Sequence, residues 1–323
     1  MSSFPEPAPS GASRRSAVRW LRWVALAAVL GFVTVFLVDN WPGIAKSLSQ
    51  LGPLALAGSI ALAVLGLLAA MLSWRAVLEG LGSALPVRAA ARVYFLSQLG
   101  KYVPGSVWPV LAQAELSKAY GVPPARAGFA AMAQLLIGMV SGIIVAGVTL
   151  ALSSTDALHT YWWLAVVALG GLVALLPPVF NRWVAVLMAI IRRPGLVEPM
   201  SARTMAVAAG WCLAMWACFG AHLWLLAFDL GAAAPRLGLL TTGAFAVAWV
   251  VGFVIIFVPA GAGAREATLV LVLSAALSAD RTLALALASR FVMLIGDGTT
   301  AVAAAAAERR TLRARGRGNV TAP

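Results

Sequence analysis

Two short stretches decide the fold: residues 99–108, LGKYVPGSVW, and residues 257–266, FVPAGAGARE. Each lies near the middle of a longer apolar segment, residues 91–118 and residues 239–277 respectively. Proline removes a helix hydrogen bond and glycine loosens the backbone, so neither segment is expected to continue as one straight helix. We expect each to form a broken helix or a re-entrant hairpin. Such a structure is tolerated at membrane depth where it lines a cavity.

The composition of the whole chain places these breaks in a membrane. Of the 323 residues, 62% are hydrophobic and only 11% are charged, which is too little polar surface to cover a soluble core of this length. A spanning helix needs about 20 mostly apolar residues. Six stretches meet this need as full crossings: residues 20–38, 54–78, 129–152, 162–179, 205–228 and 283–306. The predicted fold class is all-α, a polytopic membrane helix bundle of about six full spans plus two Pro/Gly-broken pairs.

The distribution of lysine and arginine sets the predicted orientation. The chain has 24 Lys+Arg, and with the N-terminus inside, the outer loops keep only Lys46, Arg236 and Arg281. Both termini are then cytoplasmic, the first break enters the membrane from the inside and the second from the outside. Two opposed re-entrant elements are typical of an inverted repeat. Because residues 239–258 are long enough to span alone, two crossings remain the alternative for the second element.

The two ends of the chain differ in composition from the rest. Residues 1–18 are rich in Pro, Ser and Ala, and residues 308–323 are strongly basic. We expect disordered basic cytoplasmic tails on either side of a membrane domain at residues 19–307. The positive charge is then membrane-adjacent, and we expect no nucleic-acid partner. Neither the two histidines nor the two cysteines have a metal-binding spacing, so no metal and no cofactor is expected.

Charged residues at membrane depth form the candidate substrate site. Each costs about 2.5 to 3.5 kcal/mol on insertion scales, so each is expected to face a cavity or a partner. Three cations and two carboxylates leave one net positive charge, which suits a phosphate-bearing substrate. Arg290 and Asp297, the two candidates in the last helix, are seven positions apart. This spacing puts them on one face about 10 Å apart, with room for a ligand between them. The alternative is a buried ion-pair lattice that only holds the bundle together. The candidates are Lys101, Arg265, Glu266, Arg290 and Asp297.

The breaks themselves are expected to contribute to the site. A new helix should begin after each break, near residues 106 and 264, and free N–H groups at helix N-termini attract anions. The residues expected to break the helices and gate the site are Pro104, Gly105, Pro259, Gly261 and Gly263.

In these segments the chain resembles the flippase-like family defined by the membrane region of lysylphosphatidylglycerol synthases. The resemblance is carried by LGKYVPGSVW with the downstream AELSKAYGVPPARA, by PAGAGAREATL, and by an arginine in the last helix followed by Asp297. It extends over about residues 20–307. It implies a role in the synthesis or leaflet exchange of aminoacylated phosphatidylglycerol, or in polyprenyl-linked glycan assembly. It also implies functional positions at Lys101, Pro104, Gly105, Pro259, Gly261, Arg265 and Glu266.

Three functions are compatible with these features. The favoured one is translocation or binding of an anionic phospho- or polyprenyl-phosphate lipid in the cytoplasmic membrane. The alternative is a non-catalytic membrane partner or scaffold of an envelope glycosyltransferase or lipid synthase. An enzyme acting on lipid phosphate is disfavoured, because Arg265 and Glu266 lack a visible nucleophile or a metal-binding carboxylate cluster. Since only a basic tail follows Ala307, we expect no aminoacyltransferase domain, and lysyl-lipid synthesis would fall to another protein.

Overall fold

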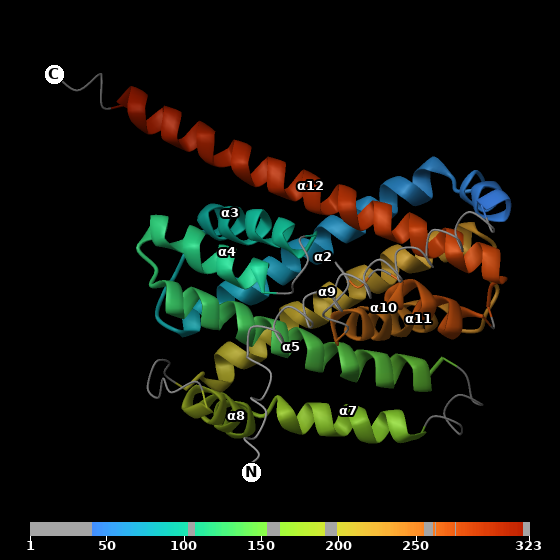
Figure 1. Ribbon diagram of the computed structural model, residues 1–323, viewed down its shortest axis with the longest axis horizontal. Coiled ribbons are helices and arrows are strands. Elements are labelled where there is room, and N and C mark those ends of the chain that lie inside the picture. The colour runs from blue at the N-terminus through green and yellow to red at the C-terminus, as the bar shows by residue number, and fades with distance from the viewer. Residues whose placement is uncertain are drawn as a thin grey trace, which may run out of the picture.

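A computed structural model describes residues 41–102, 107–153, 162–190, 199–254, 261, 263–274 and 276–318. These residues form a bundle of helices, and no strand occurs among them (Figure 1). The predicted all-α class is confirmed.

Five of the described helices are long and apolar enough to cross a membrane. They are α2 (Pro53–Gly80), α5 (Pro124–Ala151), α9 (Ala202–Asp229), α10 (Leu237–Val254) and α12 (Ala279–Gly318). Four of the predicted crossings coincide with described helices: residues 54–78 with α2, 129–152 with α5, 205–228 with α9 and 283–306 with α12. The first predicted crossing, residues 20–38, lies outside the described residues. Helix α12 continues past Ala307 to Gly318 and so takes in residues for which the sequence predicts an unstructured tail.

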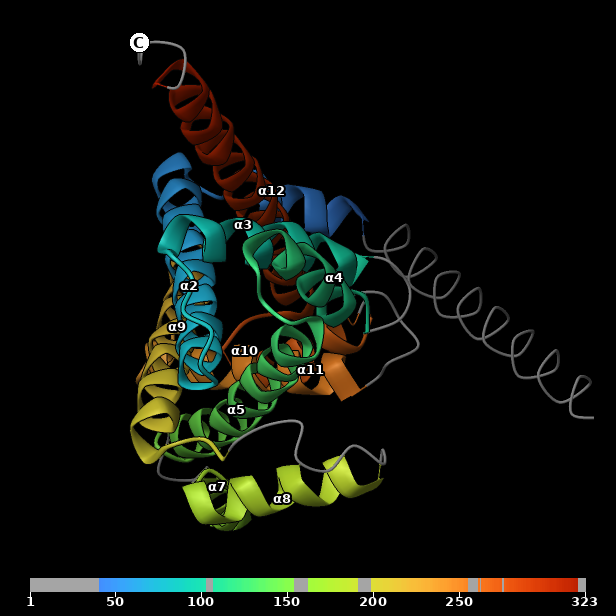
Figure 2. The same ribbon diagram turned by 90° about the vertical axis from the view of Figure 1, so that its left-hand side faces the viewer.

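The predicted crossing at residues 162–179 is not one straight helix. The structure has α7 (Trp162–Ala174) and α8 (Pro177–Ile190), which are bent by 74° at the break between them. Two consecutive prolines, Pro177 and Pro178, explain the break, because proline disfavours helical geometry in the residue before it and cannot donate to the preceding turn. Helix α7 packs against α5, and Figure 2 shows α7 and α8 together at the lower edge of the bundle.

Contacts between helix ends define two opposite faces of the bundle. On the first face, Arg126 at the start of α5 donates to the Ser83 hydroxyl after α2, at 2.8 Å. Thr204 at the start of α9 lies against Gly80, the last residue of α2. On the second face, the Gly52 amide before α2 donates to Asp229 at the end of α9, at 2.5 Å. Helix α2 therefore runs antiparallel to α5 and α9 between the two faces.

The first broken segment forms a hairpin that enters from the first face. It comprises α3 (Val87–Gln98), the 3₁₀ turn η1 (Leu99–Tyr102) and α4 (Trp108–Ser117). Helix α3 follows the end of α2, and α4 is followed by the start of α5, so both ends of the segment lie at the first face. Helices α3 and α4 pack against each other. We call this segment the first hairpin.

The second broken segment enters from the opposite face. Helix α10 begins beside Arg236, which donates to the Leu152 carbonyl at the end of α5, at 2.7 Å. Helix α11 (Ala264–Leu273) packs against α10 and ends just before α12 begins at that same face. Its 10 residues rise about 15 Å, half of a hydrocarbon core of about 30 Å. Helix α10, with 18 residues, is itself long enough to span. We call α10 and α11 together the second hairpin. Figure 1 places α3 and α4 at one end of the bundle and α10 and α11 at the other.

Buried polar contacts hold the central helices together. The Ser59 and Ser73 hydroxyls of α2 donate to backbone carbonyls of α9 at 3.1 and 2.9 Å. His222 of α9 is fully buried, with Nδ1 against the Phe219 carbonyl and Nε2 2.9 Å from the Ser289 hydroxyl of α12. Small polar residues at such interfaces let membrane helices approach closely and satisfy each other's hydrogen bonds. His222 thus has a structural role in joining α9 to α12.

Candidate functional site

A cavity of about 210 Å³ lies between the two hairpins and the central helices. Its lining comes from the first hairpin, from α2, α5, α9, α10 and α12, and from Gly261 and Arg265 of the second hairpin. Pockets for drug-sized ligands usually measure about 300 to 1,000 Å³. The cavity is therefore smaller than a typical drug-sized pocket.

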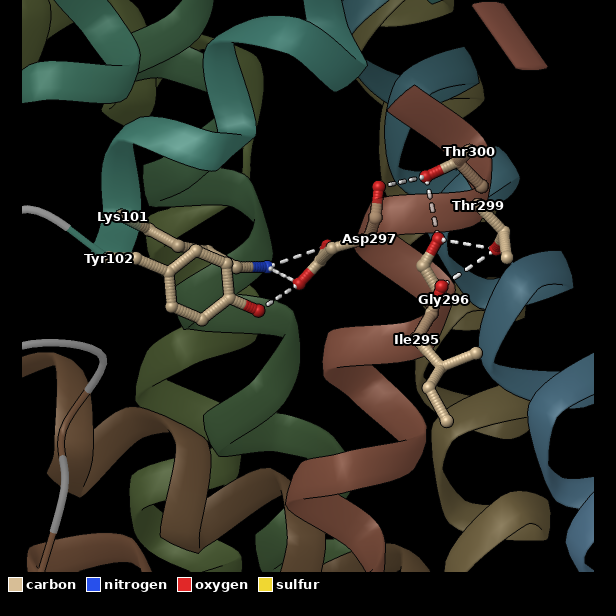
Figure 3. A network of polar contacts seen from close by, with 7 residues as sticks. All are labelled: Lys101, Tyr102, Ile295, Gly296, Asp297, Thr299 and Thr300. Carbon is tan, nitrogen blue, oxygen red and sulfur yellow. Dashed lines mark hydrogen bonds and ion pairs between the residues drawn. The ribbon is translucent and has the colours of Figure 1, made fainter. Parts of the chain in front are cut away.

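The tip of the first hairpin is tied to α12 through Asp297 (Figure 3). Lys101 Nζ lies 2.8 Å from Asp297 Oδ1 and 2.6 Å from Oδ2. The Tyr102 hydroxyl donates to Oδ2 at 2.5 Å. The Asp297 side chain is only 2% exposed, whereas the Lys101 side chain is 29% exposed. We call Lys101, Tyr102 and Asp297 the first latch.

The start of α11, in the second hairpin, is tied to α12 at Arg290, seven residues before Asp297. Glu266 Oε1 lies 2.8 Å from Arg290 Nε, and we call this pair the second latch. The other carboxylate oxygen accepts from the Gly263 amide at 2.6 Å, so Glu266 also caps α11. Arg290 lines the cavity, whereas Glu266 does not.

Arg265 also lines the cavity but forms no ion pair with any carboxylate in the described part of the chain. Its guanidinium lies 5.1 Å from the centre of the Phe245 ring, an arrangement that partly compensates a buried cation. Among the described residues, this guanidinium therefore lies at the cavity without a carboxylate counter-ion.

Two glycines make room for Arg265 at the tip of the second hairpin. A Cβ on Gly252 would lie 2.4 Å from Arg265 Cγ, and a Cβ on Gly261 would lie 2.7 Å from the Gly252 backbone. Gly261 also has φ +65°, a conformation that glycine adopts at no steric cost. The close approach of α10 and the hairpin tip therefore requires glycine at both positions.

The structure brings four of the five predicted substrate residues to one cavity: Lys101, Arg265, Arg290 and Asp297. Arg290 and Asp297 do not pair with each other, in agreement with their spacing, and each is paired with a different hairpin.

The predicted helix start at residue 264 is confirmed, with Gly263 as the N-cap residue. Helix α4 begins at Trp108 rather than near residue 106. Pro104, Gly105 and Pro259 lie outside the described residues.

Sequence reasoning missed the uncharged polar lining. Gln98, Gln113 and Gln134, from α3, α4 and α5, all line the cavity. Each lies in an otherwise largely apolar helix, and the cost of burying an amide at membrane depth was the available signal. Among the described residues, no group of three His, Cys, Asp or Glu side chains lies close enough to hold a metal ion.

Comparison with known families identifies one match. The sequence model of the lysylphosphatidylglycerol synthase TM region matches residues 22–298, which include both hairpins and both latches. No curated protein matches the chain.

Proposed function

Because the chain belongs to the family of the lysylphosphatidylglycerol synthase transmembrane region, we propose that it moves an anionic lipid between the leaflets of the cytoplasmic membrane. The family and the apolar helices make it a multi-pass membrane protein of a group related to lipid synthesis or translocation. In the proposal, the lipid phosphate binds in the cavity between the two hairpins. The proposal includes no covalent chemistry.

The observation that carries the proposal is the guanidinium of Arg265, which has no carboxylate partner in the part of the chain that the structure describes. A cation at membrane depth is costly unless an anion or water compensates it. Lys101 and Arg290 already have carboxylate partners in the two latches, so Arg265 is the cation that remains to meet a ligand. A guanidinium can bind two phosphate oxygens at once, which gives both strength and orientation.

The backbone adds to the positive potential around this cation. The N-terminal part of α4 contributes Pro109 and Val110 to the lining, and α11 begins next to Gly261, which also lines the cavity. Helix N-termini carry a partial positive charge that favours anions. The phosphate would therefore lie between two helix starts that come from opposite faces of the membrane.

The opposed hairpins supply a route between the leaflets. If one latch opens while the other stays closed, the cavity is exposed to one face at a time, as alternating access requires. Both latches end on α12, so one rigid helix can hold either hairpin in its closed position.

The test is the exchange of a fluorescent anionic phospholipid between the leaflets of liposomes, measured for wild type and Arg265→Gln. We expect exchange to fall at least tenfold, because one charge-assisted hydrogen-bonding group is lost. Folded yield should stay unchanged or rise, since removing an unpaired intramembrane charge relieves its desolvation cost. Arg265→Lys should restore exchange only in part, because an ammonium cannot bind phosphate in the bidentate manner. Arg281→Gln, which removes an exposed arginine at the second face, is the matched control.

The alternative is that Arg265 belongs to a buried ion-pair lattice that only holds the bundle together. In that case Arg265→Gln would lower folded yield, and adding Glu266→Gln would restore yield and exchange together. Recovery of both by the double variant would overturn the proposal.

The proposed orientation has its own test. The first face carries Arg75, Arg88, Arg126 and Arg203 near helix ends, and we propose that it is the cytoplasmic face. Reporters fused at the C-terminus and at residue 120 should both read cytoplasmic, and one near residue 155 should read periplasmic. A periplasmic C-terminus would contradict the orientation.

A further inference from the structure

Phe245, a fully buried residue of α10, packs its ring against the guanidinium of Arg265. The guanidinium carbon Cζ lies over the ring, 5.1 Å from its centre. An aromatic ring attracts a cation at its face, and the attraction is strongest where water is excluded. The ring therefore compensates part of a charge with which no carboxylate of the described residues forms an ion pair.

The carboxylates around the cavity are engaged elsewhere. Glu266, the next residue in the chain, binds Arg290 and caps α11. Asp297 binds Lys101 in the first latch. A carboxylate bonded to Arg265 would occupy N–H groups that a phosphate needs, because a guanidinium binds either anion through the same planar fork of donors. A ring supplies no acceptor oxygen, so it stabilises the cation and leaves those donors to a ligand.

Helix α10 contacts both the stem and the head of the Arg265 side chain. Phe245 and Gly252 are seven positions apart, which places them on one face of the helix, about two turns from each other. A Cβ on Gly252 would lie 2.4 Å from Arg265 Cγ, and the guanidinium reaches the Phe245 ring. One face of α10 therefore sets the course of the whole side chain.

Two rings of α9 hold the Phe245 ring in place. The centre of the Phe219 ring lies 5.4 Å from that of Phe245, and the His222 ring lies 4.9 Å away with an angle of 90° between the planes. His222 is fixed in turn, because both of its ring nitrogens are hydrogen-bonded, Nδ1 with the Phe219 carbonyl and Nε2 with the Ser289 hydroxyl. The ring under Arg265 is thus anchored at the junction of α9, α10 and α12.

We infer that Phe245 is a positioning residue for anion binding: it holds Arg265 at the cavity, compensates its charge and leaves its N–H groups to the phosphate. This rests on the proposed function and deepens it, since it explains how a cation can stand at membrane depth before its ligand arrives. Phe245 is not among the residues that line the cavity, so it acts through Arg265 rather than by contact with the lipid.

The test replaces Phe245 by mono-, di- and trifluorophenylalanine in the full chain, because each fluorine weakens the attraction of the ring for a cation and nearly preserves its shape. Binding of phosphatidylglycerol to the purified protein in detergent is measured from the lipid dependence of the melting temperature. We expect the affinity to fall with each fluorine, by about tenfold in total, as the loss of a desolvated cation–π contact implies. The same series at Phe129, a buried phenylalanine of α5 that does not line the cavity, is the control and should leave the affinity unchanged.

A double-mutant cycle separates positioning from packing. Phe245→Leu should weaken phosphatidylglycerol binding about tenfold when Arg265 is present and leave it unchanged in the Arg265→Gln background. A ring that acts through packing alone would lower the melting temperature without lipid in both backgrounds, and its effect on lipid affinity would not depend on Arg265. If Phe245→Leu does not fold, the fluorinated series decides, since it keeps the volume of the ring.

The failures are distinguishable. If Arg265→Gln weakens phosphatidylglycerol binding but neither the fluorinated rings nor Phe245→Leu do, the phosphate site stands and the positioning role of Phe245 is wrong. An equal loss of affinity on Phe245→Leu with and without Arg265 would also overturn the inference, because the ring would then act independently of the guanidinium. If Arg265→Gln leaves phosphatidylglycerol binding unchanged, the proposed function itself fails.

Discussion

The two hairpins reach α12 with opposite arrangements of charge. The first hairpin supplies the cation, Lys101, to a carboxylate on α12, whereas the second supplies the carboxylate, Glu266, to an arginine on α12. They also approach from opposite faces of the bundle (Figure 1). One helix therefore carries both the acceptor for one hairpin and the donor for the other.

The latches differ in how deeply they are buried. In the first latch the carboxylate is 2% and the ammonium 29% exposed, and the carboxylate receives both an ammonium and a phenol, so the difference lies in the carboxylates. In the second latch the carboxylate is 19% and the guanidinium 34% exposed, and the carboxylate also caps its own helix. Removing one member of a buried pair costs more than removing one of a solvated pair. We therefore expect the first hairpin to be held more firmly, and the second to open first.

The largest effect should come from Asp297→Asn, which breaks the first latch. It leaves the Lys101 ammonium without a counter-ion next to the cavity, and we expect a loss of about 3 kcal/mol in unfolding free energy. Thermal unfolding in detergent would measure it. Adding Lys101→Met should recover most of the loss, because the uncompensated charge is then gone. If the single variant is as stable as wild type, the first latch is not the firmer one.

The sequence predicts the helices and the breaks well, because both follow from local chemistry. Apolar length gives α2, α5, α9 and α12, and Pro-Gly content marks the two hairpins. The bend after α7 was missed because the apolar run at residues 162–179 ends in Pro177 and Pro178, which a count of apolar residues does not register.

The charged candidates were predicted from their cost at membrane depth, but their pairing was not. Lys101 and Asp297 are 196 positions apart in the chain, and only the packing of α3 and the η1 turn against α12 brings them together. The sequence does not single out Tyr102, since a phenol carries no charge whose burial cost would mark it. Gln113 was missed because an uncharged amide gives a weaker signal than a charge.

A smaller effect is expected from Glu266→Gln, which breaks the second latch. The amide oxygen can still accept from the Gly263 amide and cap α11, so mainly the ion pair with Arg290 is lost. Because that pair is partly solvated, we expect a loss of about 1.5 kcal/mol, again from thermal unfolding. A loss equal to that of Asp297→Asn would remove the difference between the latches. If the second hairpin opens first, Glu266→Gln should change the lipid-exchange rate by a larger factor than its loss of unfolding free energy would suggest.

The smallest effect is expected from Tyr102→Phe, which removes only the phenol from the first latch. Lys101 still neutralises Asp297, and Tyr102 is partly exposed, so the loss should be about 1 kcal/mol in unfolding free energy. The informative measurement is a double-mutant cycle with Asp297→Asn, because residues in direct contact are not additive. If the phenol contributes through the carboxylate, Asp297→Asn should cost about 1 kcal/mol less in the Tyr102→Phe background than in wild type. Full additivity would mean that Tyr102 stabilises the hairpin by packing alone. The firmness of the first latch would then rest on the burial of its ion pair, and the phenol would be no part of the difference between the two hairpins.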